Sequence, residues 1–434
     1  MPQSKNIIVG AGLAGLSCAS VLKDCLVLEK ESVIGGLSRT LEFRDFRFDL
    51  GGHRFFTQDR YVDKFVRDLF RDELIEVNRK SRIYRNGKFI EYPLQVSVIF
   101  QLNPFGVATA LFTYLYRKIK PLKELSFKER ATNCFGDHLY KTFFKDYTEK
   151  VWGINCSTIS PELVDIRLQN ISLMRVIKHA FSKDTSIKSF SDEFIYCRKG
   201  IGRIADILSG DLDIRLNKAV TGLVYSNSSI KEVIVNNSEH LPCDNLVSTM
   251  PLSRLMEFFD SPKPVKEAIR NLKYRDIICV LLVLKKRSYT DDHWIYIHGS
   301  MVGGRLHEPK NWSPYMSPEE KTGICIEIFC NKNDTMWNRE DAEIAHQVIK
   351  GMPFIDKFEI EDHFVVRVEY AYPIYDVNYK KNLSTVKDFL YPYKNLFLLG
   401  RTGSFKYINM DGCLGEGLKL GNFIKAKDKL NNAI

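Results

Sequence analysis

A glycine-rich segment near the N-terminus constrains the fold of this chain more than any other feature. The sequence NIIVGAGLAG joins a short apolar run to the turn at residues 10–15, and a helical pattern follows as far as Leu22. A second apolar run, CLVLEK, ends at Glu29 and Lys30. A strand, a GxGxxG turn, a helix and a second strand within about thirty residues predict a Rossmann-like dinucleotide-binding unit.

Each part of this segment has a predicted role. Gly10 permits the tight turn, Gly12 lets a pyrophosphate approach the backbone, and Gly15 lets the helix pack closely on the sheet. The first turn of the helix offers unpaired N–H groups to phosphate. Glu29 stands where a carboxylate accepts hydrogen bonds from ribose. The predicted cofactor contacts here are Gly10, Gly12, Leu13, Ala14, Gly15, Glu29 and Lys30.

Length and charge narrow the possible functions. A chain of 434 residues is long enough for two domains. The net charge of +10 fits an anionic small ligand, an acidic polymer or a membrane surface. The sequence has no dense basic block with interleaved aromatic residues, so we expect no nucleic-acid partner.

The ten cysteines are scattered, without a CxxC pair or a cysteine–histidine cluster at zinc spacing. This pattern predicts no metal site and fits a reducing compartment. Met1 is followed within a few residues by a strand rather than by a signal-peptide hydrophobic region. We therefore expect a cytoplasmic location.

One apolar stretch, VSVIFQLNPFGVATALFTYLY at residues 96–116, resembles a membrane span in composition. Gln101, Asn103 and Pro104 interrupt it, and Asn-Pro disfavours one continuous helix. The stretch favours two short buried helices and no transmembrane segment. Arg117, Lys118 and Lys120 leave peripheral membrane contact open as an alternative.

Two further segments indicate which dinucleotide binds. ESVIGGLSRT adds a second glycine pair after Glu29, and FRFDLGGHRFF ends a strand at a Gly-Gly-His turn. With these segments the chain resembles the FAD-containing family of amine oxidases, protoporphyrinogen oxidases and UDP-galactopyranose mutases. The resemblance implies FAD as cofactor, with the glycine turn against the isoalloxazine. It implies cofactor contacts at Gly36, Leu37, Ser38, Gly51, Gly52 and His53.

The C-terminal segment NLFLLGRTGSFKYINMDGCLGEGLKLGNFIKAKDKL predicts a buried strand, a glycine-rich turn and a last helix of the same domain. The positive end of that helix suits the negative charge of a reduced flavin. The family resemblance implies that this segment lies at the flavin, that Arg401 approaches the pyrophosphate and that the backbone at Val220 pairs with adenine. The remaining implied contacts are Gly400, Asn409, Met410 and Asp411.

The stretch GDHLYKTFFKDYTEKVWG predicts a helix that ends near Trp152, because apolar residues recur every four positions and Gly153 follows. Its end, YTEKVWG, resembles the Y-T-x-K-x-W-G signature of UDP-galactopyranose mutases. The hairpin RIYRNGKFIEYPL and the segment GGRLHEPKNWSPYMSP resemble mutase segments as well. The likeness implies substrate contacts from Tyr147, Trp152, Arg167, Arg305 and Tyr407, with Arg305 on a diphosphate.

The resemblance also implies a reaction. Such enzymes interconvert pyranose and furanose forms of a nucleotide sugar through covalent catalysis at N5 of reduced FAD, for precursors of cell-surface polysaccharides. The implied substrate is a nucleoside-diphosphate sugar. His53 beside the ring, Arg305 at the leaving diphosphate and Tyr407 are the implied catalytic residues.

Two parts of the sequence depart from the mutase pattern. A second arginine follows Arg167 in bacterial mutases, whereas RLQNI has Ile171 there and Arg175 comes only four residues later. The segment LMRVIKHAFSK has no match to the uracil-binding aromatic residues of the family. The segment AYPIYDVNY contains Tyr372 and Tyr375. Two interpretations fit these residues equally well: substrate-binding tyrosines, or half-buried aromatic residues of a strand.

Two other functions stay open on the sequence alone. An FAD oxidase of the amine oxidase or protoporphyrinogen oxidase type would use the apolar stretch as an entry channel, and a flavin-binding scaffold would need no catalytic residues. The predicted fold class is α/β, with a discontinuous FAD-binding domain and an inserted α+β substrate domain made of helices and an antiparallel sheet. The expected FAD-binding pieces are residues 1–80, 195–265 and 390–434, and the substrate domain is residues 81–194 and 266–389.

Overall fold

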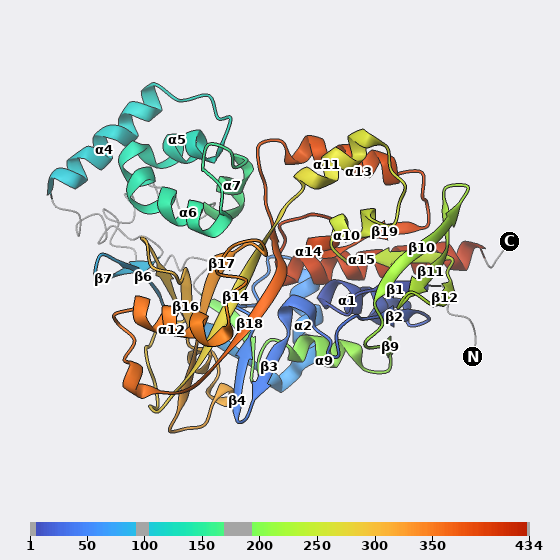
Figure 1. Cartoon of the computed structure of the whole chain (residues 1–434), viewed down its shortest axis with the longest axis horizontal. Coiled ribbons are helices and arrows are strands. Elements are labelled where there is room, and N and C mark those ends of the chain that lie inside the picture. Colours follow the sequence, from blue (N-terminus) through green and yellow to red (C-terminus); the bar gives the residue numbers. More distant parts are fainter. Residues whose placement is uncertain (1–5, 93–103, 169–192, 432–434) are drawn as a thin grey trace.

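The computed structural model describes residues 6–92, 104–168 and 193–431. One sheet is parallel, another of seven strands is largely antiparallel, and helices cover both (Figure 1). The α/β class expected from the sequence is confirmed.

The parallel sheet forms around the N-terminal strand. Its inner strands are short apolar runs buried on both faces, as parallel strands between helices require. The glycine turn leads from β1 into α1, and α15 packs directly on α1, where a side chain at Gly417 would overlap Ser17. The strand order is β19 (Leu396–Leu398), β13 (Asn245–Ser248), β1 (Asn6–Val9), β2 (Leu26–Leu28) and β9 (Asp213–Arg215), with helices α1 (Leu13–Leu22) and α15 (Met410–Asn431).

Smaller elements surround this sheet. Helix α2 begins where the Asp59 side chain accepts hydrogen bonds from the N–H groups of Tyr61 and Val62, a helix cap that the sequence dictates locally. The helices are α2 (Arg60–Phe70), α9 (Arg203–Ser209), α10 (Leu252–Met256), α11 (Lys263–Asn271), α13 (Tyr379–Leu390) and α14 (Gly400–Gly403). The strands are β3 (Thr40–Phe43) with β4 (Phe46–Asp49), β5 (Leu74–Asn78) with β8 (Glu193–Cys197), and β10 (Val220–Ser226), β11 (Ser229–Val235) and β12 (Glu239–Pro242).

The seven-stranded sheet is the larger of the two main sheets, and its strands come from residues 81–92 and 274–373. Its central strands, such as YRDIICVLLVL and TGICIEIFC, are almost entirely buried. The hairpin predicted at Asn86-Gly87 is confirmed, and it joins the sheet through parallel pairing of β6 with β15. The strand order is β18 (Ile360–Pro373), β14 (Tyr274–Leu284), β17 (Thr322–Cys330), β16 (Arg305–His307), β15 (Trp294–Ile297), β6 (Ser81–Arg85) and β7 (Lys88–Tyr92), and α12 (Asp341–Gly351) packs on β18.

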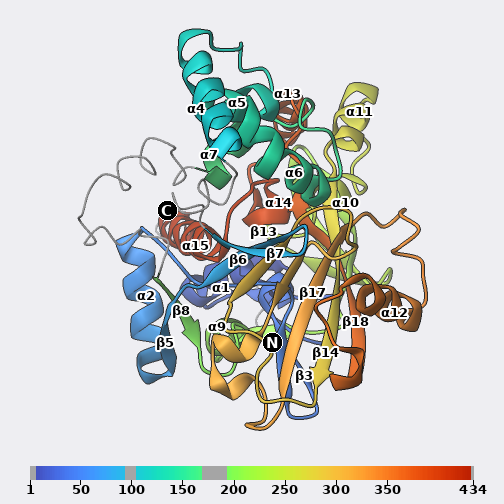
Figure 2. The ribbon, with the colours of Figure 1, turned by 90° about the vertical axis from the view of Figure 1, so that its left-hand side faces the viewer.

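A group of helices stands above this sheet in both ribbon views (Figures 1 and 2). It contains α4 (Pro104–Ile119), α5 (Phe127–Leu139), a π-helical turn (Tyr140–Phe144), α6 (Lys145–Trp152) and α7 (Glu162–Leu168). The predicted helix end at Trp152 is confirmed. Gly153 adopts the left-handed conformation with φ 68°, and its N–H donates to the Glu149 carbonyl oxygen.

The expectation of two short buried helices in the apolar stretch at residues 96–116 needs correction. Residues 93–103 lie outside the described part, and residues 104–119 form one helix rather than a short buried one. Gly106, Ala110 and Tyr114 face α5, but much of the opposite face is exposed. The pattern could not reveal this, because burial of α4 depends on which elements pack on it, and within the described ranges the extensive packing is with α5. Among the described residues, no helix has both the length and the apolar character needed to cross a membrane.

Candidate functional site

The glycine turn has the conformation that the sequence predicts. Gly10 adopts φ 100°, and a Cβ atom there would lie 2.1 Å from Oγ1 of Thr249. The buried Glu29 carboxylate accepts hydrogen bonds from the N–H groups of Ala11 at 2.8 Å and Glu31 at 3.0 Å. Glu29 therefore fixes the turn from the end of β2, and its remaining lone pairs are available to ribose hydroxyls.

The second glycine pair lies against the first. The Gly35 N–H donates to the Ala11 carbonyl oxygen at 2.8 Å, and a Cβ atom at Gly36 would lie 3.2 Å from the Cα of Gly12. Only residues without side chains allow two backbones to approach so closely. Leu37 and Ser38 follow in a short 3₁₀ turn.

Val220 and Lys30, two further predicted cofactor contacts, lie in different surroundings. Val220 opens β10, just after the Lys218 N–H donates to the Glu29 carbonyl oxygen at 2.8 Å. This backbone therefore runs beside the expected ribose position. Lys30 is exposed and pairs with Glu31 at 3.1 Å, so its cofactor contact stays a prediction.

The Gly51-Gly52-His53 turn lies where the two halves of the molecule meet. Gly51 adopts φ 87°, and the Gly52 N–H donates to Oε1 of Glu327 on β17 at 3.0 Å. Nδ1 of His53 lies 3.2 Å from the Gly51 carbonyl oxygen. Burial and the positive charge of Arg401 lower the pKa of His53 to about 4, so the ring is neutral at pH 7.

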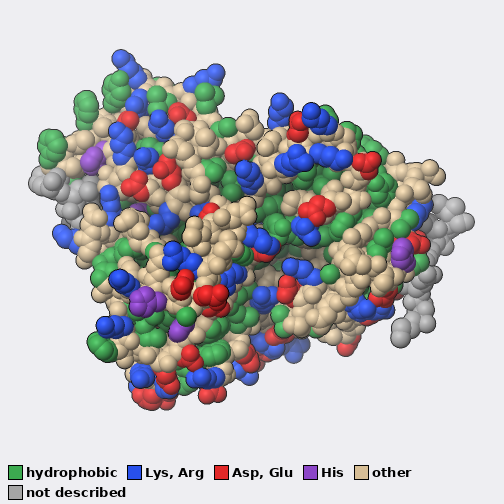
Figure 3. Space-filling view, viewed as in Figure 1, with side chains coloured by type: hydrophobic (Ala, Val, Ile, Leu, Met, Phe, Trp, Pro, Cys, Tyr) green, Lys and Arg blue, Asp and Glu red, His purple; other side chains and the backbone are tan. Residues whose placement is uncertain are grey.

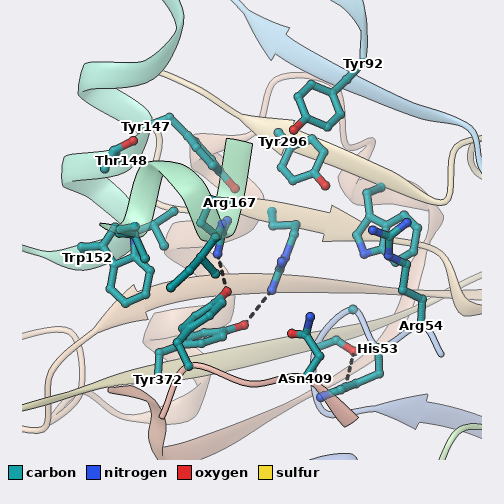
Figure 4. Close-up of a pocket in the computed structure, with 18 of the residues that line it drawn as sticks. His53, Arg54, Tyr92, Tyr147, Thr148, Trp152, Arg167, Tyr296, Tyr372 and Asn409 are labelled. Atoms are coloured by element: carbon teal, nitrogen blue, oxygen red, sulfur yellow. Dashed lines mark hydrogen bonds between the residues drawn. The ribbon is translucent and has the colours of Figure 1, made fainter. Parts of the chain in front are cut away.

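A cavity of about 380 Å³ opens beside this turn. In Figure 4, Tyr147 and Trp152 come from α6 on one side, Tyr92 and Tyr296 from the hairpin and β15, and His53 and Asn409 lie opposite. Among the described residues that line it there is no aspartate or glutamate. The cationic lining residues are Arg54, Arg79, Arg167, Arg305 and Arg401.

Arg305 is held in this wall by a buried carboxylate. Its Nε donates to Oε1 of Glu327 at 2.7 Å, and its Nη2 donates to Oε2 of Glu327 and to the Tyr372 hydroxyl at 3.2 Å. Burial alone would raise the pKa of Glu327, but Arg305 holds it below its usual value, so the pair is ionic. The protein thus positions Nε and Nη2, and within the described part of the chain Nη1 has no recorded partner and is available to a ligand.

Arg167 and Tyr407 form a second cationic group of the pocket. The Arg167 Nη1 donates to the Tyr407 hydroxyl at 2.6 Å, and the Tyr407 ring stacks with that of Tyr372 at 5.9 Å. Burial would raise the pKa of Tyr407, but Arg167, Arg401 and Arg305 lower it below its usual value. Positive potential therefore dominates this wall, which suits an anionic ligand.

Arg401 lies under the same tyrosines. Its Nε and Nη1 donate to the carbonyl oxygens of Ile408 at 2.7 Å and Ala371 at 3.1 Å, and its guanidinium lies 5.2 Å from the Tyr372 ring centre. These bonds fix it beside the cavity, and contact with a pyrophosphate stays a prediction. Gly400 precedes it at φ 76°, close to Ala14.

Tyr147 and Trp152 face the cavity together because α6 ends at Trp152. The Trp152 ring lies 5.6 Å from that of Tyr407, and the Tyr147 ring stacks on His298 at 4.7 Å. The Tyr147 hydroxyl is buried and has no hydrogen-bond partner among the described residues. An unpaired buried hydroxyl on a cavity wall is a position for a ligand hydrogen bond.

Lys150 of the same helix end anchors the neighbouring loop. Its Nζ donates to the carbonyl oxygens of Ile297, Met301 and Gly303 at 2.9–3.2 Å. Burial lowers the pKa of Lys150 to about 8. This loop leads into β16, so Lys150 helps to position Arg305.

One predicted substrate residue lies behind the pocket. Tyr375 is buried, stacks on Tyr379 at 3.9 Å and accepts a hydrogen bond from the Tyr407 N–H at 2.7 Å. It does not line the cavity and instead supports Tyr407, because the chain turns away from β18 after Pro373. Tyr372, for which the sequence analysis left the same two alternatives open, does line the cavity.

The start of α15 forms another part of the cavity wall. Asn409 and Met410 line the cavity, and Asp411 lies in the first helical turn, where burial raises the pKa of its carboxyl. The departures noted at Ile171, at Arg175 and in residues 173–183 lie outside the described residues.

Sequence reasoning missed several members of this site. Arg79 donates from Nη2 to the Tyr296 hydroxyl at 3.2 Å and lies 5.1 Å from the Tyr92 ring centre. Arg54 directly follows the Gly-Gly-His turn, Arg79 lies shortly before the predicted hairpin and Tyr92 lies in its second strand, so both motifs indicated where these residues are. Tyr296 and Glu327 carried none, since only the folded sheet brings them here.

The fold and the site together are those of a dinucleotide-binding protein with an arginine-lined cavity next to the cofactor turn. A family model described as flavin containing amine oxidoreductase matches residues 13–419. The chain therefore belongs to this family of flavin-dependent enzymes, and its cofactor is FAD.

Individual similar proteins carry the names of different flavin-dependent activities. An L-amino acid oxidase (Cdc18) of Crotalus durissus cumanensis is 24% identical over 66% of this chain and 61% of its own length. A protein of Klebsiella pneumoniae named "Probable UDP-galactopyranose mutase" is 29% identical over 37% of this chain and 44% of its own. The crystal structure of a reduced UDP-galactopyranose mutase superposes with a TM-score of 0.84 at 20% identity, covering 97% of this chain and 95% of that one. This chain spans about three fifths of the length of the first of these relatives.

Proposed function

We propose that this protein is an FAD-dependent nucleotide-sugar mutase that interconverts pyranose and furanose forms of precursors for cell-surface polysaccharides. The observation that carries the proposal is the pairing of Arg305 and Arg167 in one cavity beside the Gly51-Gly52 turn, with no carboxylate among the described lining residues. The names of one Klebsiella relative and of one structural neighbour agree with the proposal.

The residues of the cavity suit this chemistry. FAD, when bound in reduced form, supplies the nucleophile for covalent catalysis. Arg305 and Arg167 bind the diphosphate with charge-assisted hydrogen bonds and stabilise it as it leaves. The neutral His53 donates from Nδ1 to the Gly51 carbonyl oxygen, so its Nε2 can accept one hydrogen bond at the ring turn without adding charge. Tyr147, Tyr372 and Tyr407 orient the sugar nucleotide through their hydroxyl groups.

The test is isomerisation by the purified flavoprotein after reduction with dithionite. UDP-galactopyranose, UDP-galactofuranose and a panel of other nucleotide sugars are supplied, and the isomers are separated by chromatography. Isomerisation of at least one diphosphosugar by the reduced form and not by the oxidised form is expected. Bound, reducible FAD without turnover of any nucleotide sugar contradicts the proposal.

The second candidate is an oxidase, and the several relatives named L-amino acid oxidases favour it. An arginine beside tyrosines also suits the carboxylate of an amino acid. However, a single carboxylate requires one arginine, whereas the cavity presents five. Flavin bleaching and hydrogen peroxide release with L-amino acids or amines, without isomerase activity, would favour the oxidase.

A cytoplasmic location accompanies this proposal. The ten cysteines are all free, and eight of them are buried. Unpaired thiols are typical of a reducing compartment. Nucleotide sugars for the proposed reaction would meet the enzyme there.

A further inference from the structure

The outer face of α4 carries an apolar stripe that nothing in the described structure covers. Phe105, Ala108, Phe112, Leu115 and Ile119 recur at intervals of three and four residues, so they lie along one side of the helix. Phe105, Phe112 and Ile119 are 81%, 70% and 79% exposed. Hydrophobic side chains stand out along the edge of the helical group over α4 in Figure 3. Such an exposed stripe marks an interaction surface.

The buried side of α4 explains why the stripe is not core. Ala110 and Tyr114 pack against α5, where Gly136 lets the two backbones approach, since a Cβ atom there would lie 2.6 Å from the Tyr114 nitrogen. The helix therefore packs on the protein through one face, and the apolar stripe lies on another face that takes no part in this packing. Leu125, in the segment after the helix, is exposed as well.

Lysines flank this stripe on both sides. An α-helix turns by about 100° per residue. Viewed down the helix axis, Lys118 and Lys120 therefore lie on opposite sides of the row formed by Phe112 and Ile119. Their ammonium groups lie over the Tyr114 and Tyr116 rings, at 5.1 and 5.9 Å from the ring centres. Neither lysine forms an ion pair with a described residue, whereas Arg117 is held by both oxygens of Asp137.

We propose that α4 docks on an anionic membrane surface, with its apolar stripe in the interface and Lys118 and Lys120 at the phosphate level. Aromatic and aliphatic side chains flanked by lysines are the composition of helices that lie in the plane of a membrane. Sixteen residues cover about 24 Å, so α4 lies on the surface instead of spanning it. The excess of ten positive charges on the chain adds to the attraction.

The competing occupant is a second copy of the chain. The same spacing would let two α4 helices pair, but a parallel pair brings the lysines of both copies together. In an antiparallel pair the helix PFGVATALFTYLYRKI, which has no acidic residue, offers them no counter-ion. Neither arrangement neutralises the lysines, whereas an anionic lipid surface does. Charge therefore favours the membrane over a copy of the same helix.

Co-sedimentation of the FAD-loaded full chain with vesicles tests the proposal. Binding is expected to vesicles of phosphatidylcholine and phosphatidylglycerol in equal parts and not to phosphatidylcholine alone, with loss at high salt. Phe112→Glu should abolish it, and Lys118→Gln and Lys120→Gln should each weaken it about fivefold. Phe358→Glu is the matched control, because Phe358 is also largely exposed and lies after α12, away from α4.

Each outcome decides the question. Retained binding in Phe112→Glu, or equal loss in Phe358→Glu, overturns the proposal. A dimer in sedimentation velocity that Phe112→Glu dissociates, without vesicle binding by the parent, assigns the stripe to a second copy and also overturns it. If Phe112→Glu fails to fold, the two lysine variants decide alone. The result is independent of mutase activity, which is measured separately on nucleotide sugars.

Discussion

Arg305 and Gly52 are joined through a single oxygen atom. Oε1 of Glu327 accepts hydrogen bonds from the arginine Nε at 2.7 Å and from the glycine N–H at 3.0 Å. The group proposed to bind the diphosphate is thereby fixed relative to the turn proposed to hold the flavin ring. Their separation depends on one carboxylate rather than on two independent loops.

The buried ion pair of Glu327 and Arg305 predicts strong coupling between these two residues. Glu327→Gln leaves the buried Arg305 without its counter-ion, and Arg305→Gln leaves the carboxylate unpaired, so each variant should lose about 3–5 kcal/mol of unfolding free energy. The double variant should lose much less than the sum. Urea unfolding of the four proteins measures the coupling, and additive losses would show that the pair does not act as a unit.

Arg167 offers a cleaner probe of ligand binding. It donates to Tyr407 and has no acidic partner among the described residues, so Arg167→Gln should leave no buried charge unpaired. UDP binding should weaken by about 2–5 kcal/mol, measured by calorimetry. Arg287→Gln, at an exposed position paired with Glu319, is the control and should bind UDP normally. Equal affinities for both variants would remove Arg167 from the site.

Gly10 should be essential for flavin retention. Gly10→Ala places a methyl group against Thr249 at a left-handed backbone position, so the turn must shift away from the geometry that admits a pyrophosphate. The variant is expected to purify without flavin absorbance or not to fold. Gly351→Ala, where a Cβ atom meets nothing within 4 Å, should stay yellow. A yellow Gly10→Ala protein would refute the assignment of this turn.

Acid should destabilise the folded protein through its buried histidines. Burial lowers the pKa of His53 to about 4 and of His298 and His307 to about 3. Below about pH 6.5 the unfolded chain binds protons that the folded chain does not, so the free energy of unfolding falls as pH drops, by about 1.4 kcal/mol per pH unit for each histidine.

The fully buried His307 isolates this effect. Its ring stacks on Trp312 at 5.0 Å, so His307→Phe should keep the packing and remove one titrating group. The dependence of unfolding free energy on pH between about 4 and 6.5 should become less steep in the variant. Parallel curves for both proteins would show that His307 is not a neutral buried histidine.

Local features of this molecule could be predicted from the sequence. Gly10, Gly153 and the Asn86-Gly87 turn each act through backbone conformations that neighbouring residues do not alter. The Tyr147–Trp152 pairing followed from the helix end, and the parallel sheet followed from the glycine turn in its strand–helix context. The resemblance to known families directed attention to Arg305 and Tyr407, which do line the cavity.

Long-range features could not be predicted. Glu327 is 275 residues from Gly52 in sequence, and nothing around it marks a shared carboxylate. Tyr375 and Tyr372 are three residues apart, yet one is buried and the other reaches the cavity, because the chain leaves β18 between them. The exposed face of α4 likewise depends on which neighbours pack there, and apolar sequence alone predicts burial.

The order of strands in the parallel sheet has a consequence for synthesis of the chain. Strand β19 and helix α15, which complete that sheet and cover α1, are synthesised long after β1 and β2. The apolar faces of the N-terminal strands therefore stay partly uncovered until these two elements have been made. A premature stop before residue 396 would leave an open sheet without α15, a product destined for aggregation or proteolysis.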